Sequence, residues 1–277
     1  MPTTHPDKRP MTQTIRANGL EVGYDAHGAG PPVVLLHGAT SSGREDFAAQ
    51  IPFLAVGFRV FVPDARGHAT TRWDAAKGLD AAWLVDDLRA FADALGLDTF
   101  HLVGFSMGAM TALGFAVRWP ERLRTLVLAG ISPEREPRAS VARRLMDPVR
   151  IERDDPSWAV DLTRRHAPVQ GDGAWQRLLL ALAADVAGQP LVTPRELRAI
   201  TPPTLVACGD RDPFVPVGQA WGLARQVRDG RLFVAPDCGH QVMTHRPTLF
   251  NEALEDFYRS TESAARQRAV PPSEVSP

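Results

Sequence analysis

Residues 99–119 of this 277-residue chain have the sequence TFHLVGFSMGAMTALGFAVRW, and this stretch decides the fold. Its first five residues are a short apolar run rich in β-forming side chains. From Met107 onward, apolar residues recur at helical spacing until Pro120, which cannot continue a helix. Ser106 therefore lies where a strand turns sharply into a helix.

Two glycines flank this serine in the pattern Gly-x-Ser-x-Gly, Gly104 before it and Gly108 after it. Because glycine has no side chain, the strand and helix backbones can approach closely around a turn that raises the hydroxyl above the sheet. The N–H of Met107 would then lie at a helix N-terminus, where it can stabilise a negatively charged oxygen. The alternative is a tight turn in which Ser106 has no chemical role, and the rest of the chain must decide between the two.

The composition excludes several classes of protein. The chain is 44% hydrophobic and 23% charged with a net charge of −1, which is typical of a soluble globular protein, and its length is enough for one large α/β domain with an insertion. Basic residues are spread along it, so we expect no nucleic-acid partner, no membrane surface and a small-molecule substrate. The sequence shows no secretory signal and no apolar run approaching about 18 residues, which predicts a cytoplasmic protein. No pattern in it fixes an oligomeric state.

The two cysteines, Cys208 and Cys238, are too few for a disulfide framework, and no metal-binding spacing such as HExxH or CxxC occurs. We therefore expect two free thiols, no metal and no cofactor. A labile pair between the two cysteines is the alternative.

Apolar runs alternate with amphipathic segments along most of the chain. Strands are expected at 13–17, 20–26, 33–36, 59–62, 99–103, 123–129, 204–208 and 231–235, with helices at 47–56, 79–95, 107–119, 216–227 and 248–258. The dipeptide Asn18-Gly19 predicts a hairpin between the first two strands. The alternation after it implies right-handed crossovers and a mostly parallel sheet, the α/β class.

The alternation breaks after Ile131. Residues 132–194 show helical patches and no strand signal, so we expect a helical insertion there. Residues 12–131 and 195–260 then form one core. Residues 1–11 and 261–277 are polar and interrupted by proline, and we expect a disordered N-terminus and a disordered tail.

A serine hydroxyl is a weak nucleophile at neutral pH, so it needs a base and a third group that orients the base. Loops at the carboxyl ends of the last two expected strands carry suitable residues, because Asp210 and Asp212 follow one strand and His240 follows the next. With Ser106, the chain order is Ser, Asp, His. That is the order in which a nucleophile-elbow fold supplies its catalytic residues.

With these residues in place, the chain resembles the α/β-hydrolase family over about residues 12–259. Besides the elbow, four motifs carry the likeness: His37-Gly38-Ala39, Asp64-Ala65-Arg66-Gly67, Gly209-Asp210-Arg211-Asp212-Pro213 and Cys238-Gly239-His240. The resemblance implies an eight-stranded, mostly parallel sheet flanked by helices, with residues 132–194 as a helical cap.

The resemblance also implies roles for individual residues. Ser106 corresponds to the nucleophile, His240 to the general base, and Asp212 to the acid that orients the base. Asp212 is preferred to Asp210 because the family's acid is the last residue of the Gly-x-x-Asp turn.

The family's oxyanion hole corresponds here to the backbone N–H groups of Ala39 and Met107. The chain departs from the family at Ala69 and Thr71, where a glycine and a serine are usual. That loop is structural, so the departure does not affect the chemistry. An aspartate at the elbow would indicate dehalogenase or epoxide-hydrolase chemistry, and Ser106 excludes it.

Four side chains are candidates for substrate contact: His37, Phe105, Trp158 and Trp175. His37 could instead brace the oxyanion loop, and the two tryptophans could only hold the cap together. The run from Trp175 to Leu182 is apolar on more than one side, which predicts that it packs on two surfaces, one of them the cleft. His68 and His166 are further side chains that could reach the cleft.

The sequence thus predicts a serine hydrolase that acts by acyl transfer on a small carboxylic ester or lactone, with water activated by His240. One alternative is hydrolysis of a carbon–carbon bond in a diketone-like compound by the same triad, and another is a perhydrolase-like side activity. A member that only binds a ligand is the alternative from another class. The presence of Ser106, Asp212 and His240 together argues against it.

Overall fold

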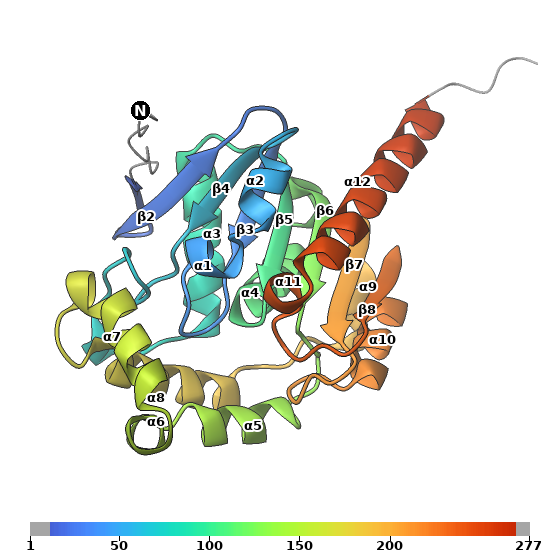
Figure 1. The fold of residues 1–277 in the computed structure, drawn as a ribbon. Coiled ribbons are helices and arrows are strands. Elements are labelled where there is room, and N and C mark those ends of the chain that lie inside the picture. Colours follow the sequence, from blue (N-terminus) through green and yellow to red (C-terminus); the bar gives the residue numbers. More distant parts are fainter. Residues whose placement is uncertain (1–11, 270–277) are drawn as a thin grey trace, which may run out of the picture.

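A computed structural model describes residues 12–269 of the chain, and Figure 1 shows one central sheet with helices around it. The eight strands lie in the order β1-β2-β4-β3-β5-β6-β7-β8. They are β1 Gln13–Ala17, β2 Leu20–His27, β3 Pro32–Leu36, β4 Arg59–Pro63, β5 Phe100–Phe105, β6 Leu123–Ala129, β7 Thr204–Gly209 and β8 Gly230–Ala235. The pairs β1–β2 and β2–β4 are antiparallel and the other five are parallel. The predicted α/β fold with an eight-stranded, mostly parallel sheet is confirmed.

The first hairpin forms where the sequence predicts it. Asn18 and Gly19 have φ angles of 48° and 76°, the left-handed values that a tight two-residue hairpin turn requires. This turn fixes the register of β1 on β2, with Ala17 opposite Leu20.

Helices cover both faces of the sheet. One face is covered by α3 Ala81–Ala94, α4 Met107–Arg118 and α10 Val217–Gln226, and the other by α1 Gly43–Asp46, α2 Gln50–Leu54, α11 Val242–His245 and α12 Pro247–Ala269. Successive strand residues point to opposite faces, so Leu102 of β5 packs under α4 while Val103 packs on the other side. The two apolar layers fix β5 in the centre of the molecule.

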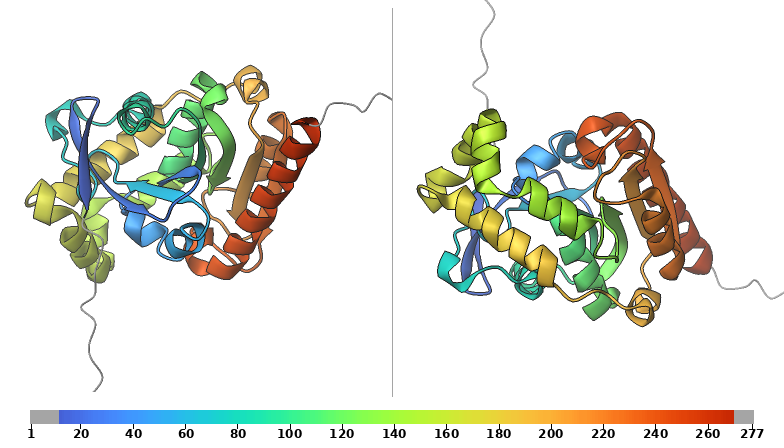
Figure 2. Two further views of the ribbon diagram at one scale, coloured as in Figure 1. Left: turned by 90° about the horizontal axis from the view of Figure 1, so that it is seen from above. Right: turned by 90° about the horizontal axis from the view of Figure 1, so that it is seen from below.

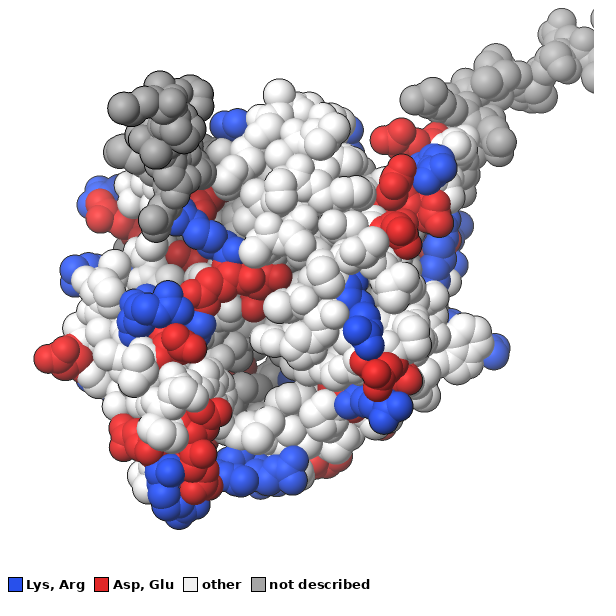
Figure 3. All heavy atoms as spheres, in the orientation of Figure 1, with Lys and Arg blue, Asp and Glu red and all other residues white. Residues whose placement is uncertain are grey.

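Five helices connect β6 to β7: α5 Arg138–Leu145, α6 Pro148–Asp154, α7 Pro156–Gln170, α8 Ala174–Gly188 and α9 Pro194–Ala199. The first four lie across the carboxyl ends of the parallel strands, at the bottom of Figure 1, and the view from below in Figure 2 shows them over that edge. We refer to α5–α8 as the cap. Over the face seen in Figure 3, basic and acidic side chains are intermixed.

Two helix predictions need correction. The helix expected at 47–56 is two short helices, because the Ser42 side chain accepts a hydrogen bond from the Glu45 N–H and starts α1 early, and α1 then ends at Phe47. The tail expected from residue 261 is helical as far as Ala269, since α12 continues through a segment rich in Ala, Arg and Glu. The disorder predicted for residues 1–11 and 270–277 lies outside the described residues.

Candidate active site

Ser106 occupies the sharp turn between β5 and α4. Its backbone has φ 51° and ψ −111°, a conformation that residues other than glycine rarely adopt. The flanking glycines make this turn possible. A Cβ atom on Gly104 would lie 2.4 Å from the carbonyl oxygen of Gly108, and one on Gly108 would lie 2.2 Å from that of Leu36. The elbow therefore needs glycine at both positions.

The structure brings the three predicted residues into one hydrogen-bonded chain. His240 Nε2 lies 2.9 Å from the Ser106 hydroxyl oxygen, and His240 Nδ1 lies 2.8 Å from Oδ2 of Asp212. The Asp212 side chain is fully buried, and that of His240 is 16% exposed. A serine hydroxyl, an imidazole and a buried carboxylate in this geometry can activate a nucleophile.

The two candidate carboxylates have different partners. Asp212 Oδ1 accepts hydrogen bonds from the backbone N–H groups of Phe214 and Val215, which fix the carboxylate while Oδ2 contacts His240. Asp210 instead accepts a hydrogen bond from the Cys238 N–H. Asp212 is thus the carboxylate at the histidine, and Asp210 joins the two loops.

Aromatic rings enclose His240 on two sides. The ring of Phe214 lies 4.4 Å from the imidazole centroid and that of Phe105 lies 5.0 Å from it. Gly130 faces the same ring, since a Cβ there would lie 3.0 Å from His240 Cε1. These contacts hold the imidazole in the plane that joins Ser106 to Asp212.

A cavity between the cap and the core opens onto Ser106, and Ala39 and Met107 also line it. Met107 is the first residue of α4, so its N–H has no partner within the helix. Among residues 12–269, the N–H groups of Ala39 and Met107 donate to no backbone or side-chain acceptor. Two residues with unpaired N–H groups thus line the same cavity as Ser106.

His37 and Phe105, two candidates for substrate contact, have other roles in the structure. His37 is buried; its Nδ1 donates to the Gly38 carbonyl and its Nε2 accepts from the Ala65 N–H, so both ring nitrogens are occupied. Gly38 also donates to the carboxylate of Asp46. His37 therefore braces the oxyanion loop, and Phe105 is buried against His240.

Trp158 and Trp175 do not line the cavity at Ser106. Trp175 is buried in a separate cluster within the cap, with Trp158 packed against it, and its indole N–H donates to Thr163 Oγ1 at 3.0 Å. The other buried members of the cluster are Ile151, Leu162 and Leu179. The prediction that these tryptophans form an acyl site is corrected, because Trp175 is buried and Trp158 partly buried in the cap cluster and neither lines the cavity.

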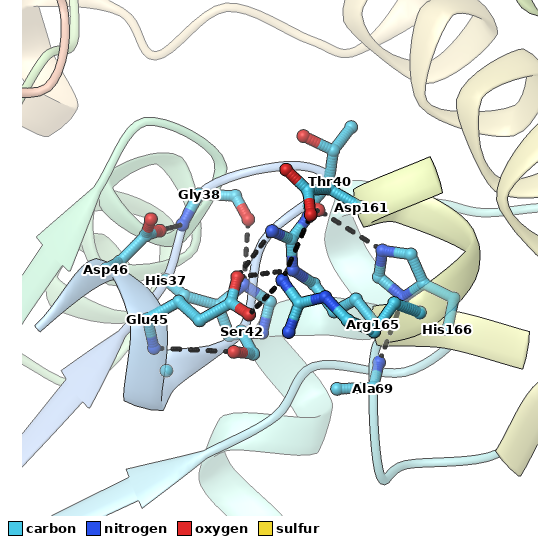
Figure 4. Close-up of polar contacts among 12 residues, drawn as sticks. His37, Gly38, Thr40, Ser42, Glu45, Asp46, Ala69, Asp161, Arg165 and His166 are labelled. Atoms are coloured by element: carbon cyan, nitrogen blue, oxygen red, sulfur yellow. Dashed lines mark hydrogen bonds and ion pairs between the residues drawn. The ribbon is translucent and has the colours of Figure 1, made fainter. Parts of the chain in front are cut away.

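One turn of α7 fastens the cap to the core, as Figure 4 shows. The Arg165 guanidinium donates to the carboxylate of Glu45 and, at 2.6 Å, to the carbonyl of Thr40. His166 donates from Nε2 to the same carbonyl at 3.2 Å and accepts the Ala69 N–H at Nδ1, 3.1 Å away. We refer to Arg165 and His166 as the α7 clamp. Both residues of the clamp donate to the carbonyl of Thr40, which is the neighbour of Ala39.

Burial keeps His68 and His166 neutral near pH 7. Desolvation lowers the pKa of His166 to about 4, and it lowers that of His68 well below the ordinary value; the positive charge of Arg165 lowers both further. The His68 ring lies 4.9 Å from that of His37 and 5.7 Å from that of His166. His68 and His166 are thus part of the packing under the cap.

Sequence reasoning missed Arg138 and Asp185, two cap residues that line the Ser106 cavity. A weak signal was available. Arg138 and Ala142 are four residues apart and lie on the same, buried face of α5. An arginine thus occupies a position in the apolar face of an amphipathic helix.

No group of His, Cys, Asp and Glu among the described residues could hold a metal ion. Both cysteines are free and buried, and burial raises the pKa of Cys208 to about 12, so its thiol stays protonated. Within residues 12–269, no helix is both long and apolar enough to cross a membrane.

This fold, with a serine at the elbow and a histidine and aspartate on the following loops, defines the class of alpha/beta hydrolases. Residues 33–253 match the model of the alpha/beta hydrolase family, and the chain belongs to that family.

Its relatives are hydrolases. The chain is 31% identical to a 2-hydroxy-6-oxo-6-phenylhexa-2,4-dienoate hydrolase from Burkholderia cepacia, covering 88% of this chain and 94% of that protein. It is 29% identical to 2-hydroxy-6-oxononadienedioate/2-hydroxy-6-oxononatrienedioate hydrolase 1 from Pseudomonas putida, over 86% and 92% of the two chains.

Solved structures agree on the fold. A meta-cleavage product hydrolase from Pseudomonas fluorescens IP01 superposes with a TM-score of 0.75 at 23% identity, covering 90% of this chain and 97% of that one. A thermophilic esterase from Thermogutta terrifontis superposes with a TM-score of 0.71 at 26% identity, over 91% and 99%.

Proposed function

We propose that this enzyme hydrolyses a carbon–carbon bond in a diketone-like substrate, of the 2-hydroxy-6-oxo-dienoate class for which its relatives are named. The observation that carries the proposal is the hydrogen-bonded chain from Ser106 through His240 to Asp212 at the floor of a cavity closed by the cap. This choice reverses the order that the sequence favours, because the named relatives act on dienoates and the same triad serves both reactions.

In the proposed reaction, the Ser106 oxygen attacks the ketone carbonyl while His240 Nε2 takes the hydroxyl proton. The substrate reacts as its 2,6-dioxo (diketone) tautomer. The bond between the attacked carbonyl carbon and the next carbon then breaks, and its electron pair is delocalised over the conjugated fragment onto the second carbonyl, which becomes an enolate. The imidazolium returns the proton to that fragment. Water, deprotonated by His240, hydrolyses the acyl-enzyme to a carboxylic acid and restores the serine.

Two other groups assist these steps. Asp212 keeps the proton of His240 on Nδ1 and stabilises the imidazolium, as its 2.8 Å contact supports. The N–H groups of Ala39 and Met107 would accept the oxyanion that forms when the carbonyl is attacked, because both are unpaired among the described residues and line the same cavity.

Hydrolysis of a small ester or lactone is the second candidate. It needs the same groups, with an alkoxide as the leaving group. Besides the esterase, a structure described as Est816, an N-acyl homoserine lactone degrading enzyme, superposes with a TM-score of 0.71 at 27% identity. The two candidates use the same triad and differ in the leaving group and in the substrate that the cavity admits.

The experiment is a direct comparison of kcat/KM. The substrates are 2-hydroxy-6-oxo-6-phenylhexa-2,4-dienoate, p-nitrophenyl butyrate and an N-acyl homoserine lactone, and Ser106→Ala is the control. We expect the dienoate to be preferred by at least about 100-fold, because discrimination between substrate classes comes from differences in transition-state binding. A higher kcat/KM for the ester or the lactone would refute carbon–carbon cleavage as the main activity.

A further inference from the structure

Arg138 is a buried cation in the wall of the Ser106 cavity, and two of its guanidinium nitrogens have no hydrogen-bond partner among residues 12–269. Its residue is only 8% exposed, although arginine is almost never buried unless paired. Its Nε and Nη2 atoms are both buried, and neither has a hydrogen-bond partner among the described residues. The cavity that it lines also contains Ser106.

The nearby Arg135 differs from Arg138, because its guanidinium is hydrogen-bonded within the protein. Arg135 donates to the backbone carbonyls of Val186, Ala187 and Gln189, at the end of α8. It therefore fastens one helix end to the segment before α5. Arg138, three residues later, reaches no such carbonyl among the described residues.

The acidic residue of the cavity does not neutralise Arg138 by direct contact. Asp185 accepts a hydrogen bond from the Ala81 N–H at 2.8 Å and acts on Arg138 only through its charge. Burial, followed by the charge of Arg135, lowers the pKa of Arg138. Burial likewise raises the pKa of Asp185, so the cavity disfavours the charged form of both side chains.

An unpaired buried guanidinium destabilises the folded protein, since the group has lost its water and gained no acceptor. Such a group is maintained in a pocket when a ligand supplies the acceptor. A guanidinium presents its N–H groups in a planar fork that matches two carboxylate oxygens. The missing partner of Arg138 is therefore a planar anion that enters with the substrate.

We infer that Arg138 binds the carboxylate of the substrate, and that this enzyme selects organic anions whose carboxylate reaches the cap while the reacting carbonyl lies at Ser106. The inference rests on the proposed function, because a dienoate carries such a carboxylate. It adds the residue that recognises it and predicts that neutral analogues are poor substrates.

The test uses Arg138→Met, with Arg144→Met as the matched control, since Arg144 lies on the same helix and is exposed. Two substrate pairs are measured: the phenyl dienoate against its methyl ester, and the mono-p-nitrophenyl ester of succinate against p-nitrophenyl butyrate. Each pair compares a carboxylate with a neutral analogue, one for carbon–carbon cleavage and one for ester cleavage. Binding of the dienoate and its methyl ester to Ser106→Ala, with and without Arg138→Met, provides a measurement that needs no turnover.

In the wild type, kcat/KM and affinity should favour the carboxylate by about 10- to 100-fold, the value of a charge-assisted hydrogen-bonded pair. Arg138→Met should reduce that preference to near unity in every pair that is turned over and in the binding measurement, and Arg144→Met should leave it unchanged. Unfolding by urea should show Arg138→Met to be at least as stable as the wild type, because removal of an unpaired buried charge relieves strain on the fold.

A preference that survives Arg138→Met would overturn the inference, and so would a loss of stability together with an equal loss of activity on both members of a pair. If only the ester pair is cleaved and its preference depends on Arg138, the proposed carbon–carbon cleavage fails and the inference on Arg138 stands. The two ideas are thus tested separately.

Discussion

Lowering the pH from 7 to 4 should release the cap from the core through His166. The neutral imidazole performs two tasks at once, because Nε2 donates to the Thr40 carbonyl while Nδ1 accepts the Ala69 N–H. Protonation of Nδ1 would place two N–H groups against each other. The positive charge of Arg165 opposes protonation as well, and the uncharged ring of His68 lies beside that of His166.

The size of the effect follows from the pKa. His166 has an ordinary pKa of 6.5 when exposed in the unfolded chain and a pKa of about 4 in the folded protein. The unfolded state therefore binds more protons between these values, so stability is complete above about pH 6.5 and falls as the pH falls toward 4. The difference corresponds to about 3 kcal/mol of unfolding free energy by pH 4.

The assay is urea unfolding of the wild type and His166→Gln at a series of pH values from 7 to 4. His68 and His101 are also buried with lowered pKa values, so the wild type alone reports their sum. Glutamine can still donate to Thr40 but does not titrate in this range. The wild type should lose about 3 kcal/mol more than the variant between pH 7 and 4. Equal losses in the wild type and His166→Gln would refute the neutral clamp.

Three further predictions concern the elbow, the acid and the cap. Asp212→Asn should lower kcat by about 10² to 10⁴, with the far-ultraviolet circular dichroism unchanged, whereas Asp210→Asn should do much less; the reverse ranking would exchange their roles. Trp175→Ala should lower the unfolding free energy by about 3 to 5 kcal/mol and leave the order of substrates unchanged, and a changed order would place this side chain at the substrate. Gly104→Ala should abolish activity, because its Cβ would lie 2.4 Å from the carbonyl oxygen of Gly108. The control is Gly218→Ala, whose Cβ would have no atom within 4 Å and which should raise stability slightly. An active Gly104→Ala variant would contradict the packing at the elbow.

The sequence predicts the sheet and the elbow well because their signals are local. The run from Phe100 to Phe105, the glycines beside Ser106 and the Asn18-Gly19 turn each specify their own backbone conformation. The position of the helix after β3 was less predictable. It depends on the Ser42 cap, a single hydrogen bond that the apolar spacing does not reveal.

The site was predictable in part for the same reason. The residues alone leave Asp210 and Asp212 open, and the resemblance to the family's Gly-x-x-Asp turn implies Asp212; the structure places that carboxylate at His240. The α7 clamp was not predictable, because its contacts join α7 to residues 97 to 126 positions away, and no pattern within the cap specifies those partners. The tryptophans of the cap show the limit of composition as a guide, since Trp175 is buried in the cap cluster and not at Ser106.

Three arginines of the insertion have different environments. The difference distinguishes arginines that hold parts of the protein together from the one that we propose to bind the substrate. Arg135 is held by carbonyl groups at the end of α8, and Arg165 by Glu45 and Thr40, so both are matched within the protein. Arg138 has no such match among the described residues, and it alone of the three lines the cavity at Ser106.

The position of Thr40 links these two functions. Its carbonyl accepts hydrogen bonds from both residues of the α7 clamp. Its neighbour Ala39, whose N–H has no partner among the described residues, lines the same cavity as Ser106. A cap that loosens at Thr40 would therefore displace the Ala39 N–H and the Arg138 guanidinium together. Because a rigid conjugated substrate would have to meet both groups at once, the clamp would affect substrate binding and oxyanion stabilisation as one event.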